Sequence, residues 1–149
     1  MRSPKNKLLI IAISSLLLFP GCAALLLNML LPNLIGVLAE QLGVTESQAK
    51  TATGAIMIFT KGSLEFDDFK KLTGLIPGAD EYINQAESVI KDPMGTVEDL
   101  TGALIMQGLP KNTVETAKPI LGCYLRAKQE YKLADKIEKI LTPAVKPAS

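Results

Sequence analysis

Residues 44–61 read VTESQAKTATGAIMIFTK, and this stretch decides the class of fold. Thr45 and Gln48 have the spacing of a capping box, in which each side chain bonds the backbone N–H of the other residue at a helix start. Apolar residues then follow at helical spacing, at Ala49, Ala52, Ile56 and Phe59. Residues 56–59 alone would also fit a short strand, but their place after a cap favours a helix. The stretch therefore predicts a helix that ends near Lys61-Gly62-Ser63.

Downstream, helical spacing returns in short segments that glycine and proline separate. Further helices are predicted to start near residues 65, 80, 96, 114 and 130. Their apolar positions are Phe66, Phe69 and Leu72; Ile83, Ala86 and Ile90; Val97, Leu100 and Leu104; Val114, Ala117, Leu121 and Tyr124; and Leu133, Ala134, Ile137, Ile140 and Leu141. Thr96 and Asp99 predict a second capped start, and Asp92-Pro93 predicts the end of the helix before it. Pro119 predicts a kink or a wide first turn.

Upstream, an apolar helix is predicted to end at Gly43, with Pro32 in its first turn. The glycines are interpreted as turn residues, because none has the spacing of a phosphate-binding loop. Strand patterns are nearly absent. The predicted fold class is therefore all-α, a small bundle of about six to seven short helices after an N-terminal signal segment.

The first 22 residues are typical of an export signal. Three basic residues precede a charge-free apolar run at residues 8–19, which is shorter than the roughly 20 residues of a membrane span. The predicted organisation is a signal peptide at 1–21, an apolar membrane-proximal segment at 22–32, a helical domain at 33–142 and a flexible tail at 143–149.

Three fates of this segment remain open. Gly21-Cys22 resembles the lipobox of bacterial lipoproteins, which predicts lipidation at Cys22, although Phe19 and Pro20 depart from that pattern. Ordinary signal peptidase could instead cut after Ala23 or Ala24. The apolar run could also stay uncut as an anchor through Leu31. Each fate places the body of the protein outside the cytoplasm, in the cell envelope on the periplasmic or outer-membrane side, because the basic flank stays inside.

Charge and composition argue against a nucleic-acid partner. The whole chain carries 16 basic and 15 acidic residues, and all three bases of residues 1–21 leave if the signal is removed. The rest is then mildly acidic, with 5% aromatic residues and no Trp. Residues 40–99 are net acidic and residues 100–149 net basic, which favours packing of the two halves against each other. The expected partners are the membrane, through a lipid or signal anchor, and an unidentified protein.

Candidate catalytic groups are few. The chain has no His, which removes the usual base and the commonest metal ligand. The acidic pairs Asp67-Asp68 and Asp80-Glu81 lie at predicted helix starts, where carboxylates favour the helix dipole. We therefore expect no enzyme activity, no cofactor and no metal site.

The two cysteines allow two interpretations. Cys22 and Cys123 could form a single disulfide in an oxidising compartment. If lipid uses Cys22, Cys123 is instead expected to be a small buried apolar residue.

The last predicted helix has a lysine-rich outer face between Arg126 and Lys139. Such a face could attract anionic lipid or an acidic partner. Glu130, Asp135 and Glu138 lie among the bases, which favours an ordinary solvated surface.

The middle of the chain resembles the bacterial VcgC/VcgE family, a domain of unknown function. The similarity covers roughly residues 33–142, and its most recognisable motif is Ile76-Pro77-Gly78-Ala79-Asp80. Glu65 stands where family members commonly have Ser. Other matching positions are 38–45, Gln48-Ala49, 54–56, Lys61, Leu64, Asp68-Phe69, Leu72, Gly108-Leu109, Val114 and 119–121. The resemblance implies a small helical exported protein and supplies no catalytic residue.

Together these patterns predict an exported, non-enzymatic helical protein. Its expected form is lipid-anchored in the envelope, with a structural or protein-interaction role. The alternative is a soluble periplasmic or secreted helical module that binds an apolar ligand or a peptide.

Overall fold

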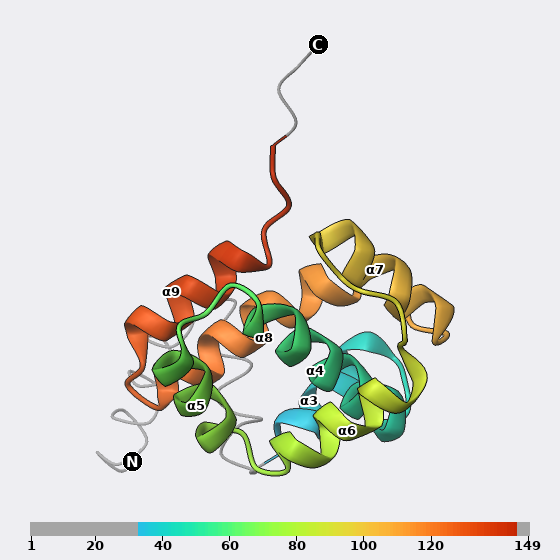
Figure 1. Ribbon diagram of the computed structural model, residues 1–149. Helices are drawn as coiled ribbons and strands as arrows, with labels where there is room; N and C mark the ends of the chain where they lie inside the picture. Colours follow the sequence, from blue (N-terminus) through green and yellow to red (C-terminus); the bar gives the residue numbers. More distant parts are fainter. Residues whose placement is uncertain (1–32, 146–149) are drawn as a thin grey trace, which may run out of the picture.

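The computed structural model describes residues 33–145, and within this range it contains seven α-helices and no strand (Figure 1). The predicted all-α class is confirmed. The helices are α3 (Leu34–Leu42), α4 (Glu46–Lys61), α5 (Phe66–Leu75), α6 (Ala79–Val89), α7 (Val97–Met106), α8 (Thr113–Ala127) and α9 (Tyr131–Ile140). The predicted signal segment and Pro32 lie outside the described residues.

Helix α4 is the centre of the bundle. It packs against α3, α5, α6 and α7, and α8 and α9 form a neighbouring pair (Figure 1). Because α4 is surrounded, most of its length is buried, from Thr51 through Met57. The capped stretch that predicts the fold class is therefore also the stretch around which the other helices assemble.

The predicted helix ends are largely confirmed. The backbone N–H of Gln48 donates to Thr45 Oγ1 at 3.1 Å and Thr45 N–H donates to Gln48 Oε1 at 3.1 Å, so the capping box is present. Gly43 ends α3 in the left-handed conformation with φ 65°, where glycine has no Cβ to clash. Helix α6, however, ends at Val89, three residues before Asp92, so that predicted boundary is wrong.

The burial of the apolar residues of α5 differs from the prediction. Leu72 is buried and Phe69 is partly buried, but Phe66 is 79% exposed. Burial therefore increases along the helix, from Phe66 through Phe69 to Leu72. Periodicity identifies a common face, but it does not show how much of that face a neighbour covers.

The interpretation of the glycines as turn residues is wrong for the five that lie inside helices: Gly36, Gly54, Gly74, Gly102 and Gly122. Gly54 lies inside α4, where α6 comes so close that an added Cβ would stand 1.9 Å from the carbonyl oxygen of Tyr82. Gly122 lies inside α8 beneath the side chain of Glu138. Helix α8 also runs through Pro119. These residues keep helical geometry, and the two glycines permit close contacts that a side chain would prevent.

The second capping box, at the start of α7, makes stability depend on pH. Asp99 Oδ2 accepts from the backbone N–H groups of Thr96 at 2.9 Å and Gly95 at 3.1 Å. Hydrogen bonding with Thr96, and then with Gly95, lowers the pKa of Asp99 below its ordinary 3.8. A carboxyl with a lowered folded-state pKa contributes stability above its unfolded pKa and loses it as the pH falls through the folded value.

We therefore expect Asp99→Asn to destabilise the protein above about pH 4, with a difference from wild type that shrinks as the pH falls further. Urea unfolding midpoints between about pH 2.5 and pH 6 measure this difference. Glu98→Gln is the control, because it removes the same charge from the same helical turn. A stability difference between Asp99→Asn and the wild type that stays constant with pH would contradict the lowered pKa of Asp99.

Candidate functional site

Cys123 lies in the second half of α8 and is 5% exposed. Its sulfur is disulfide-bonded. The other cysteine of the chain, Cys22, lies outside the described residues, so the predicted lipidation at Cys22 stays a prediction. Burial of Cys123 was expected, and its oxidised state matches the disulfide interpretation rather than the buried thiol.

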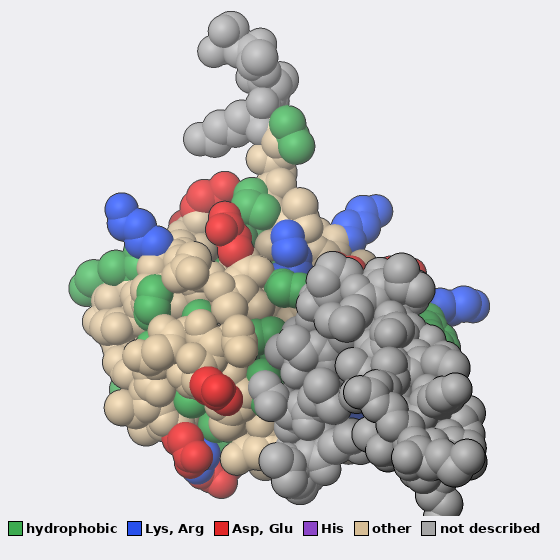
Figure 2. Space-filling view, turned by 180° about the vertical axis from the view of Figure 1, so that it is seen from behind, with side chains coloured by type: hydrophobic (Ala, Val, Ile, Leu, Met, Phe, Trp, Pro, Cys, Tyr) green, Lys and Arg blue, Asp and Glu red, His purple; other side chains and the backbone are tan. Residues whose placement is uncertain are grey.

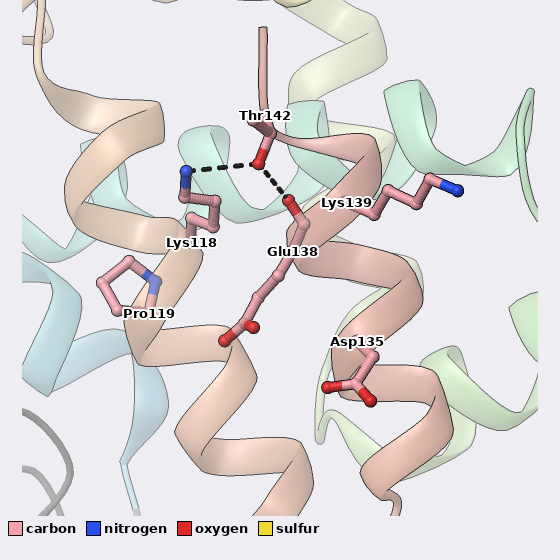
Figure 3. Close-up of a pocket in the computed structure, with 6 residues that line it drawn as sticks. All are labelled: Lys118, Pro119, Asp135, Glu138, Lys139 and Thr142. Atoms are coloured by element: carbon pink, nitrogen blue, oxygen red, sulfur yellow. Dashed lines mark hydrogen bonds between the residues drawn. The ribbon is translucent and has the colours of Figure 1, made fainter. Parts of the chain in front are cut away.

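A cleft of about 500 Å³ lies between α8, the helix that carries Cys123, and α9 (Figure 3). Lys118 and Pro119 of α8 line one side, and α9 with the residue just after it lines the other through Asp135, Glu138, Lys139 and Thr142. In Figure 3 the Glu138 carboxylate points toward α8, whereas Lys139 points away from it. Lys118 Nζ donates to Thr142 Oγ1 at 3.4 Å, and Thr142 Oγ1 donates to the carbonyl oxygen of Glu138 at 2.7 Å.

Arg126 bonds the two acids that line this cleft. It donates from Nη1 and Nη2 to the two oxygens of Glu138 at 2.7 and 2.8 Å, and from Nη2 to Asp135 Oδ1 at 2.9 Å. Hydrogen bonding to Glu138 is the main reason that the pKa of Arg126 is raised. Both carboxylates therefore have a cationic partner, and the bonds of Arg126 to Glu138 and Asp135 join α8 to α9.

This arrangement depends on two local features of the backbone. Gly122 leaves room for the carboxylate of Glu138, since an added Cβ would stand 1.9 Å from Glu138 Oε1. Gln129 adopts a φ of 63° between the two helices, a left-handed conformation that turns the chain back. Asp135 and Glu138, three residues apart on α9, were the sequence signal for a shared partner, but nothing local identifies Arg126 as that partner.

We expect Arg126 and Glu138 to couple by about 1 kcal/mol in a double-mutant cycle with Arg126→Met and Glu138→Gln. The bond is bidentate, and each side chain is only about one third exposed, at 32% and 31%. Thermal unfolding of the four proteins measures the coupling.

Lys50 and Glu81 provide the matched control, because their single contact is 3.4 Å long and Glu81 is 67% exposed. Their coupling should be smaller, between about 0 and 0.5 kcal/mol. Equal coupling in the two pairs would contradict the importance of bidentate geometry at Arg126.

The lysine-rich face of α9 is partly neutralised by acids. Lys136 bonds Asp68 of α5, and this hydrogen bond is the main reason that the pKa of Lys136 is raised. Lys71 of α5 pairs with Glu130 at 3.5 Å. Elsewhere on the surface, in the view from behind of Figure 2, the visible acidic and basic side chains of the described residues also lie scattered. The two ion pairs of this region leave fewer unpaired bases there than the sequence alone suggests.

The predicted packing of the acidic half against the basic half is observed in the Asp68–Lys136 pair. The Lys71–Glu130 pair joins the halves with the opposite polarity, and Arg126 pairs within the basic half. Net charge along the chain thus predicts only part of the observed pairing, because individual positions decide which charges meet.

The two acidic pairs do not come together. Asp67 and Asp68 lie in the first turn of α5, and Asp80 and Glu81 lie in the first turn of α6. Among residues 33–145 no group of three or more His, Cys, Asp or Glu side chains could hold a metal ion. Glu65 precedes α5 at the N-cap without a side-chain capping bond.

A second cleft, of about 420 Å³, lies between the ends of α4, α6 and α7 and was not predicted. Gln85 Nε2 donates to the carbonyl oxygen of Ser47 at 2.8 Å and to Thr51 Oγ1 at 2.8 Å. Its lining is almost entirely neutral and polar, with one partly exposed apolar side chain: Ser47, Gln48, Thr51, Gln85, Val89 and Gln107. These hydrogen bonds join α6 to α4, so the cleft is first of all part of their packing.

The described fold defines a small all-α protein with a buried, oxidised cysteine and charged groups that pair with one another. The model of the family described as "Protein of unknown function VcgC/VcgE (DUF2780)" matches residues 22–139, and the chain belongs to this family. No curated protein and no solved structure matches the chain. Within residues 33–145 no helix combines the length and apolar character that a membrane crossing requires.

Proposed function

We propose that this protein is exported and that its helical domain works in the cell envelope, held at the membrane by its N-terminus. The observation that carries this proposal is the N-terminal pattern, in which three basic residues precede a charge-free apolar run before Cys22. Disulfides persist in oxidising compartments such as the bacterial periplasm and are rare in the reducing cytosol. The disulfide-bonded state of Cys123 supports such a compartment.

Two chemistries would hold the N-terminus at the membrane. One is diacylglycerol on Cys22, and the other is the apolar run itself, left uncut. In either case the basic flank remains inside and the helical domain lies outside.

The role proposed for the domain is structural or protein-binding rather than catalytic. Four of its acids already have cationic partners: Glu138 and Asp135 bond Arg126, Asp68 bonds Lys136, and Glu81 bonds Lys50. Exposed apolar side chains such as Met106 at the end of α7 are of the kind that protein interfaces use. The alternative, a soluble module for an apolar ligand, has less support, because most of the residues that line the two clefts described above are of charged or polar types.

Protease accessibility tests export directly. The full chain with a C-terminal epitope tag is produced in a bacterium with two membranes, and spheroplasts are treated with protease before and after lysis. We expect loss of the tag in unlysed spheroplasts. The control carries Leu16→Arg and Leu17→Arg, which interrupt the apolar run and should leave the tag protected until lysis.

If the wild-type tag is protected to the same extent as the tag of the control, the proposal that the protein is exported is wrong. Recovery of the digested form from the membrane pellet favours the anchored protein, and recovery from the soluble periplasmic fraction favours the alternative module.

A further inference from the structure

We propose that the cleft between the ends of α4, α6 and α7 binds an extended, uncharged peptide segment of a partner protein. Backbone N–H groups of the segment donate to the side-chain oxygens of Gln85 and Gln107, and one of its apolar side chains packs on Val89. The cleft volume of about 420 Å³ lies within the usual range of ligand sites, about 300 to 1,000 Å³. This inference rests on the proposed function, because it supplies a partner and a site for the protein-binding role.

The side-chain amide of Gln85 is held in one orientation. Its Nε2 donates to the carbonyl oxygen of Ser47 at 2.8 Å, to Ser47 Oγ at 3.2 Å and to Thr51 Oγ1 at 2.8 Å. The nitrogen therefore faces α4, and the oxygen, on the other side of the amide carbon, faces away from these partners. Within residues 33–145 this oxygen accepts no hydrogen bond, and it is not buried. Gln85 thus presents an acceptor that is open and already oriented before a ligand binds.

Gln107 repeats this arrangement on a second helix. It is the C-cap residue of α7, and its Nε2 donates to the carbonyl oxygen of Val89, the last residue of α6, at 3.4 Å. In the described part of the chain its Oε1 also has no donor, and it is not buried either. Gln48, the third glutamine of the lining, differs because Thr45 and Gly108 occupy both ends of its amide. The cleft therefore has two open amide oxygens.

The absence of charge in the cleft selects an uncharged occupant. Among the described residues, those that line it are Ser, Thr, Gln and Val, and none is charged. An ammonium group also donates hydrogen bonds, but enclosing it without a carboxylate partner costs much more than burying an N–H group that finds an acceptor. The cleft between α8 and α9 differs in this respect, because lysines and carboxylates line it.

A peptide in an extended conformation supplies uncharged donors. Every residue except proline has a backbone N–H, and a helix uses most of these groups internally, so free ones belong to extended or irregular segments. Val89 lines the cleft and is 45% exposed, and Met106, next to Gln107 in the chain, is 83% exposed. These side chains favour contact with an aliphatic side chain. A glycan also has uncharged donors, but it has no aliphatic side chain to place against Val89.

The experiment uses the purified full chain in detergent and a displayed library of random short peptides. Enriched peptides are synthesised with both ends blocked, and their affinities are measured by fluorescence polarisation. We expect enrichment of peptides that have an aliphatic residue and no charged side chain. Methylation of single backbone nitrogens along such a peptide should weaken binding at the positions that donate to the cleft.

Gln107→Met removes one acceptor at nearly constant volume and should weaken the selected peptides about fivefold, the effect of one hydrogen bond. Gln41→Met is the matched control, because Gln41 is exposed on α3 and does not line the cleft, so affinity should not change. Val89→Ala is a second variant at an exposed position and should also weaken binding. Thermal unfolding checks that each variant is folded.

The inference is wrong if no peptide is enriched over the bare support, or if the wild type, Gln107→Met and Val89→Ala bind the selected peptides equally. Tighter binding of chitotriose, a neutral oligosaccharide, with the same dependence on Gln107 would also overturn it. Protease treatment of spheroplasts tests export separately. An exposed tag without peptide enrichment keeps export and removes this site, whereas a protected tag with peptide binding keeps the site and removes export.

Discussion

Gly54→Ala is expected to destabilise the protein by about 3 kcal/mol or more, at the upper end of the range for overpacked cores. A Cβ at this position would stand 1.9 Å from the carbonyl oxygen and 2.4 Å from the carbonyl carbon of Tyr82. Both atoms belong to the backbone of α6, so no side-chain rotation can relieve the overlap. Helix α6 would have to move away from α4, which also strains the hydrogen bonds of Gln85 to Ser47 and Thr51.

Gly102→Ala is the matched control for this prediction. Gly102 also lies inside a helix, α7, but an added Cβ there meets nothing within 4 Å. The same substitution should therefore stabilise the protein by about 0.5 to 1 kcal/mol, because alanine favours the helix and lowers the entropy of the unfolded chain. Thermal and urea unfolding of the three purified proteins give the two differences. Similar values for Gly54→Ala and Gly102→Ala would rule out the close α4–α6 contact.

Loss of the disulfide is the second large effect. A bond between Cys22 and Cys123 closes a loop of about 100 residues, for which chain entropy gives roughly 4.7 kcal/mol, and measured disulfides commonly give about 2 to 4 kcal/mol. We expect dithiothreitol to lower the unfolding midpoint of the purified wild type by a corresponding amount. Burial of Cys123 should make the reduction slow until the protein opens.

Cys22→Ala separates the bond from the packing of Cys123, because it leaves the buried side chain in place. This variant should match the reduced wild type in stability and should not respond to dithiothreitol. The double variant Cys22→Ala, Cys123→Ala should be less stable than Cys22→Ala only by the packing that is lost at position 123. Equal stability of the oxidised wild type and Cys22→Ala would mean that the bond is missing or has no effect.

The sequence located the helices well because their signals are local. The capping boxes at Thr45 and Thr96 each involve residues three positions apart, and both are observed. Apolar spacing also identified the buried faces of α7 and α9, where Leu100, Leu104, Leu133 and Ile137 are fully enclosed. The family was recognisable for a similar reason, since its motifs are short runs such as residues 76–80.

Burial at helix ends and the pairing of charges were harder to predict. Phe66 shares a stripe with Phe69 and Leu72, but no neighbour covers its side chain, which stays exposed. Arg126 meets Glu138 because a left-handed residue, Gln129, turns α9 back along α8. Neither result follows from spacing, because each depends on where a different helix lies.

The sequence by itself determined the all-α class, the helix starts and the family, because capping and periodicity act within a few residues. Tertiary structure decided what the glycines do and what state Cys123 is in. Gly54 and Gly122 are helix-interior residues whose missing side chains admit a backbone and a carboxylate from other helices. Cys123 is enclosed in the core as half of a disulfide. These properties arise only when segments far apart in the chain come into contact.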